Sequence, residues 1–253
     1  MAILGLSIGL FVIVLLRYFF FAGGLYWLCW KRNRDAWAWR RIQSEFPDPR
    51  ILRAEIRWSV ITSAVFALSG AVAFWAWQRG WTRIYLDVAK HGWPYFFFSM
   101  GLLAWLHDTY FYWTHRWMHL PRFYRLFHKV HHDSRNPTPW AAFSFHPTEA
   151  VIEAIILPAL VFVIPVHPAA FMALLMFMTV LGVVNHTGYE LYPRSFARNR
   201  FWKHWISATH HQMHHRRVTC NYGLYFTIWD RWMGTHHATY EEEYDAIQAR
   251  RPL

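Results

Sequence analysis

The sequence predicts an all-α membrane protein, an integral bundle of about four to five spanning or membrane-embedded helices with a helical cap on its cytoplasmic side. Two observations support this fold class. First, 55% of the 253 residues are hydrophobic and 20% are aromatic, which is high for a soluble domain. Second, long apolar runs alternate with stretches crowded with Arg, Lys and His, which keeps the mean hydropathy at only +0.06. A bilayer is therefore the expected solvent of the apolar runs.

Three apolar runs in the first half of the chain are long enough to be transmembrane helices. The first runs from about residue 2 to residue 30, is interrupted by Arg17, and suits a tilted span. No basic segment precedes it and no small-residue cleavage signal follows, so we expect a retained span rather than a signal peptide. The second covers roughly residues 58–77 and the third roughly residues 95–113.

A fourth apolar stretch, residues 150–184, is expected to form a helical hairpin. It is broken at the segment Ile164–Pro168, which contains two prolines. Each arm has only about 15 to 18 residues, whereas a full span needs about 20. A shallow or re-entrant pair therefore competes with two full spans.

The net charge of +11 could indicate nucleic acid, an acidic substrate or the anionic face of a membrane. Three polar segments, residues 31–57, 114–149 and 185–253, hold 22 of the 26 Lys and Arg residues, and the linker 78–94 holds three. This bias satisfies the positive-inside rule if those segments are cytoplasmic. It explains the charge without a nucleic-acid partner, since no nucleic-acid-binding motif gathers the basic residues.

Histidine is the other unusual feature, with 17 residues concentrated in the segments placed in or beside the cytoplasm. One pair has the spacing H-x-x-x-H, and two later clusters have the spacing H-x-x-H-H. On a helix, positions three and four apart lie on neighbouring parts of one face, so each cluster can direct its imidazoles at one place. The clustered residues are His115, His119, His128, His131, His132, His211, His214 and His215.

Eight imidazoles exceed what one transition metal can use, so the spacing predicts two metal ions. Imidazole suits iron, zinc and copper alike, and the two isolated cysteines, Cys29 and Cys220, argue against an iron–sulfur centre. A zinc protease is disfavoured because Arg116 stands where His-Glu-x-x-His would place its general base. A non-catalytic metal-binding protein or transporter remains the alternative, although transporters place such groups near the bilayer midplane.

Four segments resemble the histidine-box fatty acid hydroxylase and sterol desaturase superfamily. They are DTYFYWTHRWMH (108–119), FHKVHHDSRNPTPW (127–140), AAFSFHPTE (141–149) and HHQMHHRRVTCNYGLYFTIWDRWMGT (210–235). The similarity covers roughly residues 95–237. It divides the chain into N-terminal helices with a basic loop (1–94), a hydroxylase-like catalytic domain (95–237) and a C-terminal tail (238–253).

The resemblance implies an oxygen-dependent, non-haem di-iron enzyme that hydroxylates or desaturates a C–H position of a sterol, fatty acyl chain or related lipid. Its cofactors would be two iron ions, with zinc as the alternative in purified protein, and O2 would be the co-substrate. No His-Pro-Gly-Gly motif of a fused haem domain is present, so a separate ferredoxin or cytochrome b5 type electron donor is implied. A bacterial inner membrane is favoured over the endoplasmic reticulum, with the active site on the cytoplasmic side. A catalytically silent relative would show the same ligands.

The resemblance also implies ligands for the two metals: the eight box histidines, with His186 in NHTGYE as a ninth. Glu190, four residues later, is a candidate to ligate or orient a metal. His146 is a candidate ligand, a partner of a ligand or a helix-entry residue before Pro147. Side chains expected beside the ligands or at the surface are His107, His204, His210, His236 and His237. Asp108, Asp133 and Asp230 are expected to accept hydrogen bonds from ligand imidazoles, or else to pair with nearby arginines.

Overall fold

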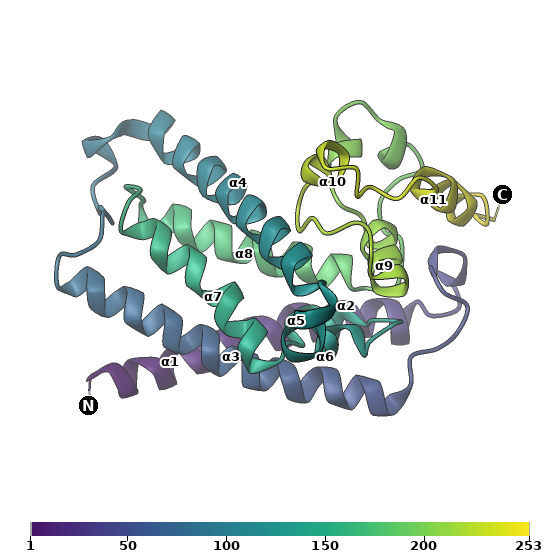
Figure 1. The fold of residues 1–253 in the computed structure, drawn as a ribbon, viewed down its shortest axis with the longest axis horizontal. Helices are drawn as coiled ribbons and strands as arrows, with labels where there is room; N and C mark the ends of the chain where they lie inside the picture. The colour runs from purple at the N-terminus through teal and green to yellow at the C-terminus, as the bar shows by residue number, and fades with distance from the viewer. Residues whose placement is uncertain (1, 253) are drawn as a thin grey trace.

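The computed structural model describes residues 2–252, and within them the regular secondary structure is helical, with three isolated β-bridges besides. The helices form an elongated bundle with a smaller helical cap at one end, far from the N-terminus (Figure 1). The all-α membrane bundle that the sequence predicts is confirmed.

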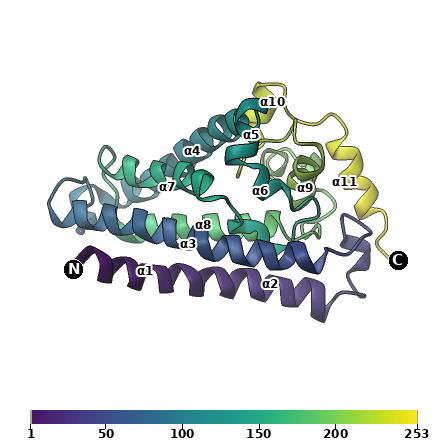
Figure 2. The ribbon, with the colours of Figure 1, turned by 60° about the horizontal axis from the view of Figure 1, so that its bottom comes forward.

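One long helical rod and one long helix form the first layer of the bundle. The rod contains α1 (Ala2–Tyr18), a π-helical turn η1 (Phe19–Gly23), α2 (Gly24–Tyr26) and a second π-helical turn η2 (Trp27–Arg32). Helix α3 (Pro49–Gln78) begins where Asp48 caps it by accepting a hydrogen bond from the Arg50 N–H at 2.7 Å. Small side chains on α3, such as Ser59, Ser63 and Ala67, are buried, which lets neighbouring helices approach closely. The rod and α3 run side by side (Figure 2).

Three further helices form the second layer. They are α4 (Gly92–Met118), which follows the short turn η4 (Val88–Lys90), then α7 (Pro147–Val161) and α8 (Pro168–Asn185). Proline at the first position of α7 and of α8 fixes the start of each helix. Leu103 of α4, Leu157 of α7 and Leu174 of α8 meet in the largest apolar cluster. Helix α7 also packs on α3, which joins the two layers.

Three helical segments in the described residues are long and apolar enough to cross a membrane: Ile3–Arg32, Pro49–Gln78 and Pro168–Asn185. The second begins at Pro49, well before the predicted start near residue 58, because a polar, basic first part precedes its apolar part. The third predicted span lies within α4, which is long but interrupted by polar side chains. At 15 residues α7 is shorter than the about 20 residues that a full span needs.

The cap assembles at the end of the bundle where α4 ends (Figure 1). Its α-helices are α5 (Pro121–Phe127), α6 (Lys129–His132), α9 (Ala208–Arg217), α10 (Ile228–Trp232) and α11 (Tyr240–Gln248). The shorter 3-10 turns are η3 (Ala38–Arg40), η5 (Pro139–Phe143), η6 (Phe196–Arg198) and η7 (Trp202–His204). Most histidines of the chain lie where α4, α6, α8 and α9 converge.

Candidate metal centre

Nine histidines from four places in the chain converge into two adjoining groups. Within each group, one ligand atom per residue lies within 4.8 Å of every other ligand atom. The first group contains His115, His119, His128, His132 and His214. The second contains His131, His186, His211 and His215. Nearly all of these side chains are buried; His119 is half-buried.

Each H-x-x-H-H cluster is divided between the two groups. His128 and His132 join the first group, while His131 joins the second. In α9 the division is reversed, because His211 and His215 join the second group and His214 joins the first. Successive residues of a helix point about 100° apart, so side chains four apart share a direction and sequence neighbours diverge. Each H-x-x-H-H cluster therefore supplies histidines to both groups.

The outer ring nitrogens of three of these histidines donate hydrogen bonds to backbone carbonyl oxygens. The Nδ1–H of His115 donates to the Tyr222 carbonyl oxygen at 2.8 Å, and that of His214 donates to the Cys220 carbonyl oxygen at 2.7 Å. The Nδ1–H of His186 donates to the Gly182 carbonyl oxygen at 2.7 Å. In a neutral imidazole the other nitrogen then carries a lone pair and no proton. The Nε2 atoms of these rings are therefore left as electron-pair donors.

Within each group, Nε2 atoms face one another at close range. The Nε2 atoms of His115 and His128 are 2.8 Å apart, and those of His132 and His214 are 3.0 Å apart. In the second group the Nε2 atoms of His186 and His211 are 2.9 Å apart. The Nε2 atoms of His115 and His128 both lack a proton and cannot hydrogen-bond to each other, so their converging lone pairs are stabilised by a cation placed between them. The donor set fits metal ions, and all-imidazole ligation suits iron, zinc and copper.

Burial keeps the imidazoles outside the spans in the ligating form. Desolvation lowers the pKa of His128, His131 and His132 well below its ordinary value of 6.5. The same burial lowers the pKa of the three histidines of the α9 box well below that value. A neutral imidazole is the form that binds a metal, so the folded chain holds these rings ready to ligate near neutral pH.

Glu149 is a site residue that the sequence analysis missed. Its carboxylate Oε1 accepts a hydrogen bond of 2.5 Å from the Nδ1–H of His128, and both side chains are buried. A carboxylate behind a ligand imidazole fixes the orientation of the ring and raises its basicity. The signal was present in FHPTE, because Glu149 is an acidic residue at the start of an otherwise apolar run.

Glu190 and His146 lie in neither group. The Oε2 atom of Glu190 accepts hydrogen bonds from the Thr209 N–H at 3.0 Å and from the Thr209 hydroxyl at 2.7 Å. Glu190 thereby anchors the first turn of α9, the helix that carries the third box. His146 caps α7, and its Nδ1 accepts from the Thr148 backbone N–H at 3.4 Å.

The three aspartates do not contact the box imidazoles, which corrects the expected direct hydrogen bonds. Asp108 accepts from the backbone N–H of Tyr225 at 2.7 Å, and Asp230 accepts from that of Tyr222 at 2.7 Å. Both aspartates therefore hold the loop whose Tyr222 carbonyl orients His115. Asp133 pairs at the surface with Lys129, whose ammonium lies 2.6 Å from the carboxylate.

The remaining histidines of interest are also outside the two groups. The Nδ1 of buried His107 lies 3.1 Å from the Tyr225 hydroxyl. His210 is buried and stacks against His236, with ring centroids 5.4 Å apart. His236 in turn lies 3.3 Å from a carboxylate oxygen of Glu241. These residues pack the cap around the box helices.

Comparison with known proteins assigns the family. The fatty acid hydroxylase family matches residues 100–235. A Delta(7)-sterol 5(6)-desaturase, ERG3B of Gibberella zeae, is 31% identical over 77% of this chain and 60% of its own length. The erg3C desaturase of Aspergillus fumigatus is 29% identical over 80% of this chain and 69% of its own length. The lathosterol oxidase of Rattus norvegicus is 31% identical over 64% of this chain and 54% of its own length.

The chain thus spans about half to two thirds of the length of these curated relatives. No solved structure matches it. The matched region includes both H-x-x-H-H boxes, the H-x-x-x-H pair and His186. The chain belongs to the fatty acid hydroxylase family.

Proposed function

We propose that this protein is a membrane-bound, oxygen-dependent di-iron oxidoreductase that hydroxylates or desaturates a C–H position of a sterol or related lipid. The observation that carries the proposal is the pair of adjoining histidine groups, in each of which the ring nitrogens lie within 4.8 Å of one another. The relatives support a sterol-like substrate, because their names describe Delta(7)-sterol desaturases and lathosterol oxidases. An apolar substrate also suits a protein whose bundle lies in the membrane.

We assign the first metal to the group of five histidines and the second to the group of four that includes His186. A bound iron pair would supply the reductive activation of O2 for oxidation of an unactivated C–H bond. The chain holds four of the imidazoles in place through their outer nitrogens, since Glu149 fixes the ring of His128 and backbone carbonyls fix those of His115, His186 and His214. Glu190 contributes by anchoring α9.

Aromatic side chains surround the histidines and exclude water from them. The Phe111 ring centroid lies 4.8 Å from that of His115, and the Tyr222 ring centroid lies 5.1 Å from that of His119. On the second group, the Phe145 ring centroid lies 5.1 Å from that of His131. Exclusion of water strengthens electrostatic interactions in such a site and limits side reactions.

The proposal includes an external electron donor of the ferredoxin or cytochrome b5 type. It also places the histidine groups on the cytoplasmic side, in a bacterial inner membrane rather than the endoplasmic reticulum. The basic segments around the cap support the cytoplasmic side through the positive-inside rule.

The test begins with protein purified in detergent and assayed for iron and zinc per chain. Reduced donor, O2 and a sterol-containing lipid extract are then supplied, and products one oxygen atom heavier or two hydrogen atoms lighter are sought by mass spectrometry. The matched control is His128→Ala combined with His211→Ala, which removes one member of each group. Folded protein with fewer than about one and a half metals per chain would overturn the two-metal assignment. Full metal content without O2 consumption or product would instead favour a non-catalytic metal protein.

A further inference from the structure

Within residues 186–252, four large apolar side chains of the cap are exposed, and they lie close together. Phe201 is 75% exposed, Trp202 52%, Trp232 64% and Met233 38%, and they lie on or next to η7 and α10. We call these four residues the aromatic edge. The two segments that carry it are joined, because the Thr227 hydroxyl and the Arg231 guanidinium both donate to the Lys203 carbonyl oxygen, at 3.0 and 3.3 Å.

The elements carrying the aromatic edge lie beside the bundle, at the level of its helices. The Trp232 ring centroid is 6.3 Å from that of Trp105, which lies midway along α4. The Phe177 ring centroid of α8 lies 5.2 Å from that of Tyr225 and 6.1 Å from that of Trp205. Figure 2 shows α10 over the last turns of α4.

The depth of these contacts follows from helix geometry. Helix α8 is one of the three segments able to span a membrane, and Phe177 precedes its last residue, Asn185, by eight positions. At 1.5 Å per residue the cap reaches about 12 Å along α8 from the end at which the histidines gather. Half of a hydrocarbon core is about 15 Å thick, so this depth falls within one leaflet.

The backbone of this region is compatible with such a depth. The Ile206 N–H donates to the Tyr225 carbonyl oxygen at 2.9 Å, and the Thr227 N–H donates to the His204 carbonyl oxygen at 2.8 Å. The guanidinium of Arg231 is paired with Glu241 at 3.0 Å. Polar groups satisfied within the protein are the condition for placing irregular chain in a bilayer. Exposed Arg200, next to Phe201, can reach anionic lipid headgroups.

We propose that the aromatic edge inserts into the leaflet on the cap side, so that lipid rather than water or protein covers it. Aromatic side chains beside basic ones are typical of segments that lie in a membrane interface. This inference is independent of the catalytic proposal. It also revises the expected topology, which left all of residues 185–253 in the aqueous phase.

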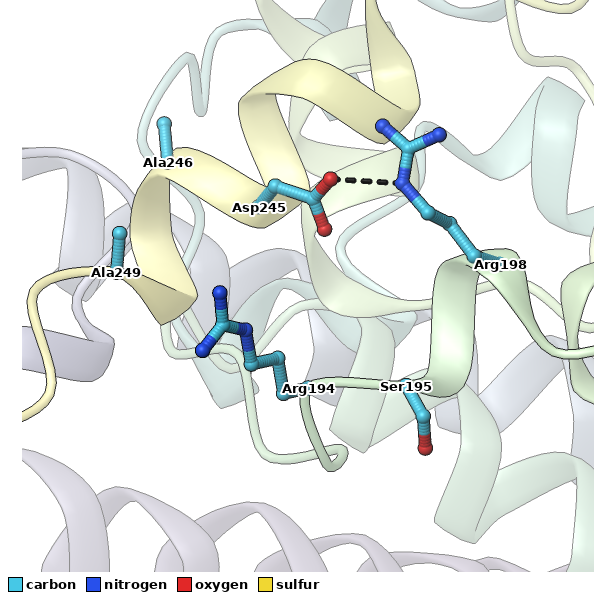
Figure 3. Close-up of a pocket in the computed structure, with 6 residues that line it drawn as sticks. All are labelled: Arg194, Ser195, Arg198, Asp245, Ala246 and Ala249. Atoms are coloured by element: carbon cyan, nitrogen blue, oxygen red, sulfur yellow. Dashed lines mark hydrogen bonds and ion pairs between the residues drawn. The ribbon is translucent and has the colours of Figure 1, made fainter.

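The test uses single cysteines in metal-loaded protein reconstituted into nanodiscs of phosphatidylcholine and phosphatidylglycerol. Phe201→Cys and Trp232→Cys are labelled with a small environment-sensitive fluorophore. The matched control is Ala246→Cys on α11, since Ala246 is exposed and lines a surface pocket together with the charged side chains of Arg194, Arg198 and Asp245 (Figure 3). The two native thiols, Cys29 and Cys220, are buried, and the parent protein gives their labelling background.

The expected result is quenching by brominated lipid several-fold stronger at positions 201 and 232 than at position 246, and quenching by aqueous iodide several-fold weaker. Equal iodide quenching at all three positions would overturn the proposal, because the edge would then face water. Protection from both quenchers would also overturn it, because protein would then cover the edge. The metal content of each cysteine variant shows whether it is folded. If Trp232→Cys loses its metal, Met233→Cys is used in its place.

Discussion

Replacing Glu149 by glutamine tests whether a carboxylate behind His128 contributes to metal binding. The substitution keeps the size of the side chain and a carbonyl oxygen able to accept from the Nδ1–H of His128, but it removes the negative charge. The pair is buried and its hydrogen bond is short, so the charge is little screened by water. The imidazole of His128 should therefore become a weaker electron donor.

Loss of such a partner typically lowers metal affinity about 10- to 100-fold, which corresponds to roughly 1.4 to 2.7 kcal/mol. We expect Glu149→Gln near the lower end, because the hydrogen bond survives, and Glu149→Ala near the upper end, because the ring loses its partner. The matched control is Glu153→Gln, one turn further along α7, since Glu153 makes no hydrogen bond to any histidine of the two groups.

The assay is competition with a chelator of known affinity, followed by metal analysis of the protein at each chelator concentration. Glu149→Gln should release one ion per chain at a lower chelator concentration than the parent, because His128 belongs to the first group only. The second ion should be released as in the parent. If Glu149→Gln and Glu153→Gln both hold metal as tightly as the parent, Glu149 does not support the site and the reasoning is refuted.

Three further expectations concern the division of the site, its supporting loop and its response to pH. His131→Ala and His214→Ala should each lower the metal content by about one ion per chain, because they belong to different groups, whereas His146→Asn should retain both ions with the α7 cap preserved. Loss of neither ion in the two alanine variants would contradict the grouping. Asp230→Asn should lower the free energy of unfolding by about 1–3 kcal/mol in a thermal melt, because buried N–H groups such as that of Tyr222 lose a charged acceptor. An unchanged melting temperature would contradict that role. The metal-free protein should lose stability below pH 6.5, since unfolded histidines take up protons while burial keeps the folded pKa values lower. The expected loss is about 1.4 kcal/mol per pH unit for each such histidine, and a flat profile between pH 7 and 5 would contradict it.

The arrangement of helices was largely predictable because apolar runs and proline positions are local features. The break at Pro165 and Pro168 separates α7 from α8 as expected. The expected span over residues 58–77 covers only the apolar part of α3, because hydropathy detects the part of a helix that suits lipid, whereas the helix itself begins at the Asp48 cap and Pro49. Its basic first turns are helical but not apolar.

Within the site, the sequence by itself determined the residue types and their spacing along each helix. The eight box histidines could be selected because helical periodicity places side chains three and four apart near one another. His186 was selected only through the resemblance to the family. The need for two ions followed from counting imidazoles. Their division into groups of five and four did not follow, since it depends on how α4, α6, α8 and α9 are packed against one another.

The tertiary structure alone decided which groups support the histidines. The Asp108 carboxylate accepts a hydrogen bond from the backbone N–H of Tyr225, 117 positions later in the sequence. The Glu190 carboxylate, in the loop after α8, accepts one from the Thr209 hydroxyl of α9. Glu149 was hidden because a carboxylate at the start of an apolar helix could as well have faced water or another charge. Local patterns fix what each helix can present on its faces. The hydrogen-bond partner of a buried polar atom is decided only when distant segments pack together. Burial makes an unpaired polar group costly, so few packing arrangements satisfy every buried polar group at once.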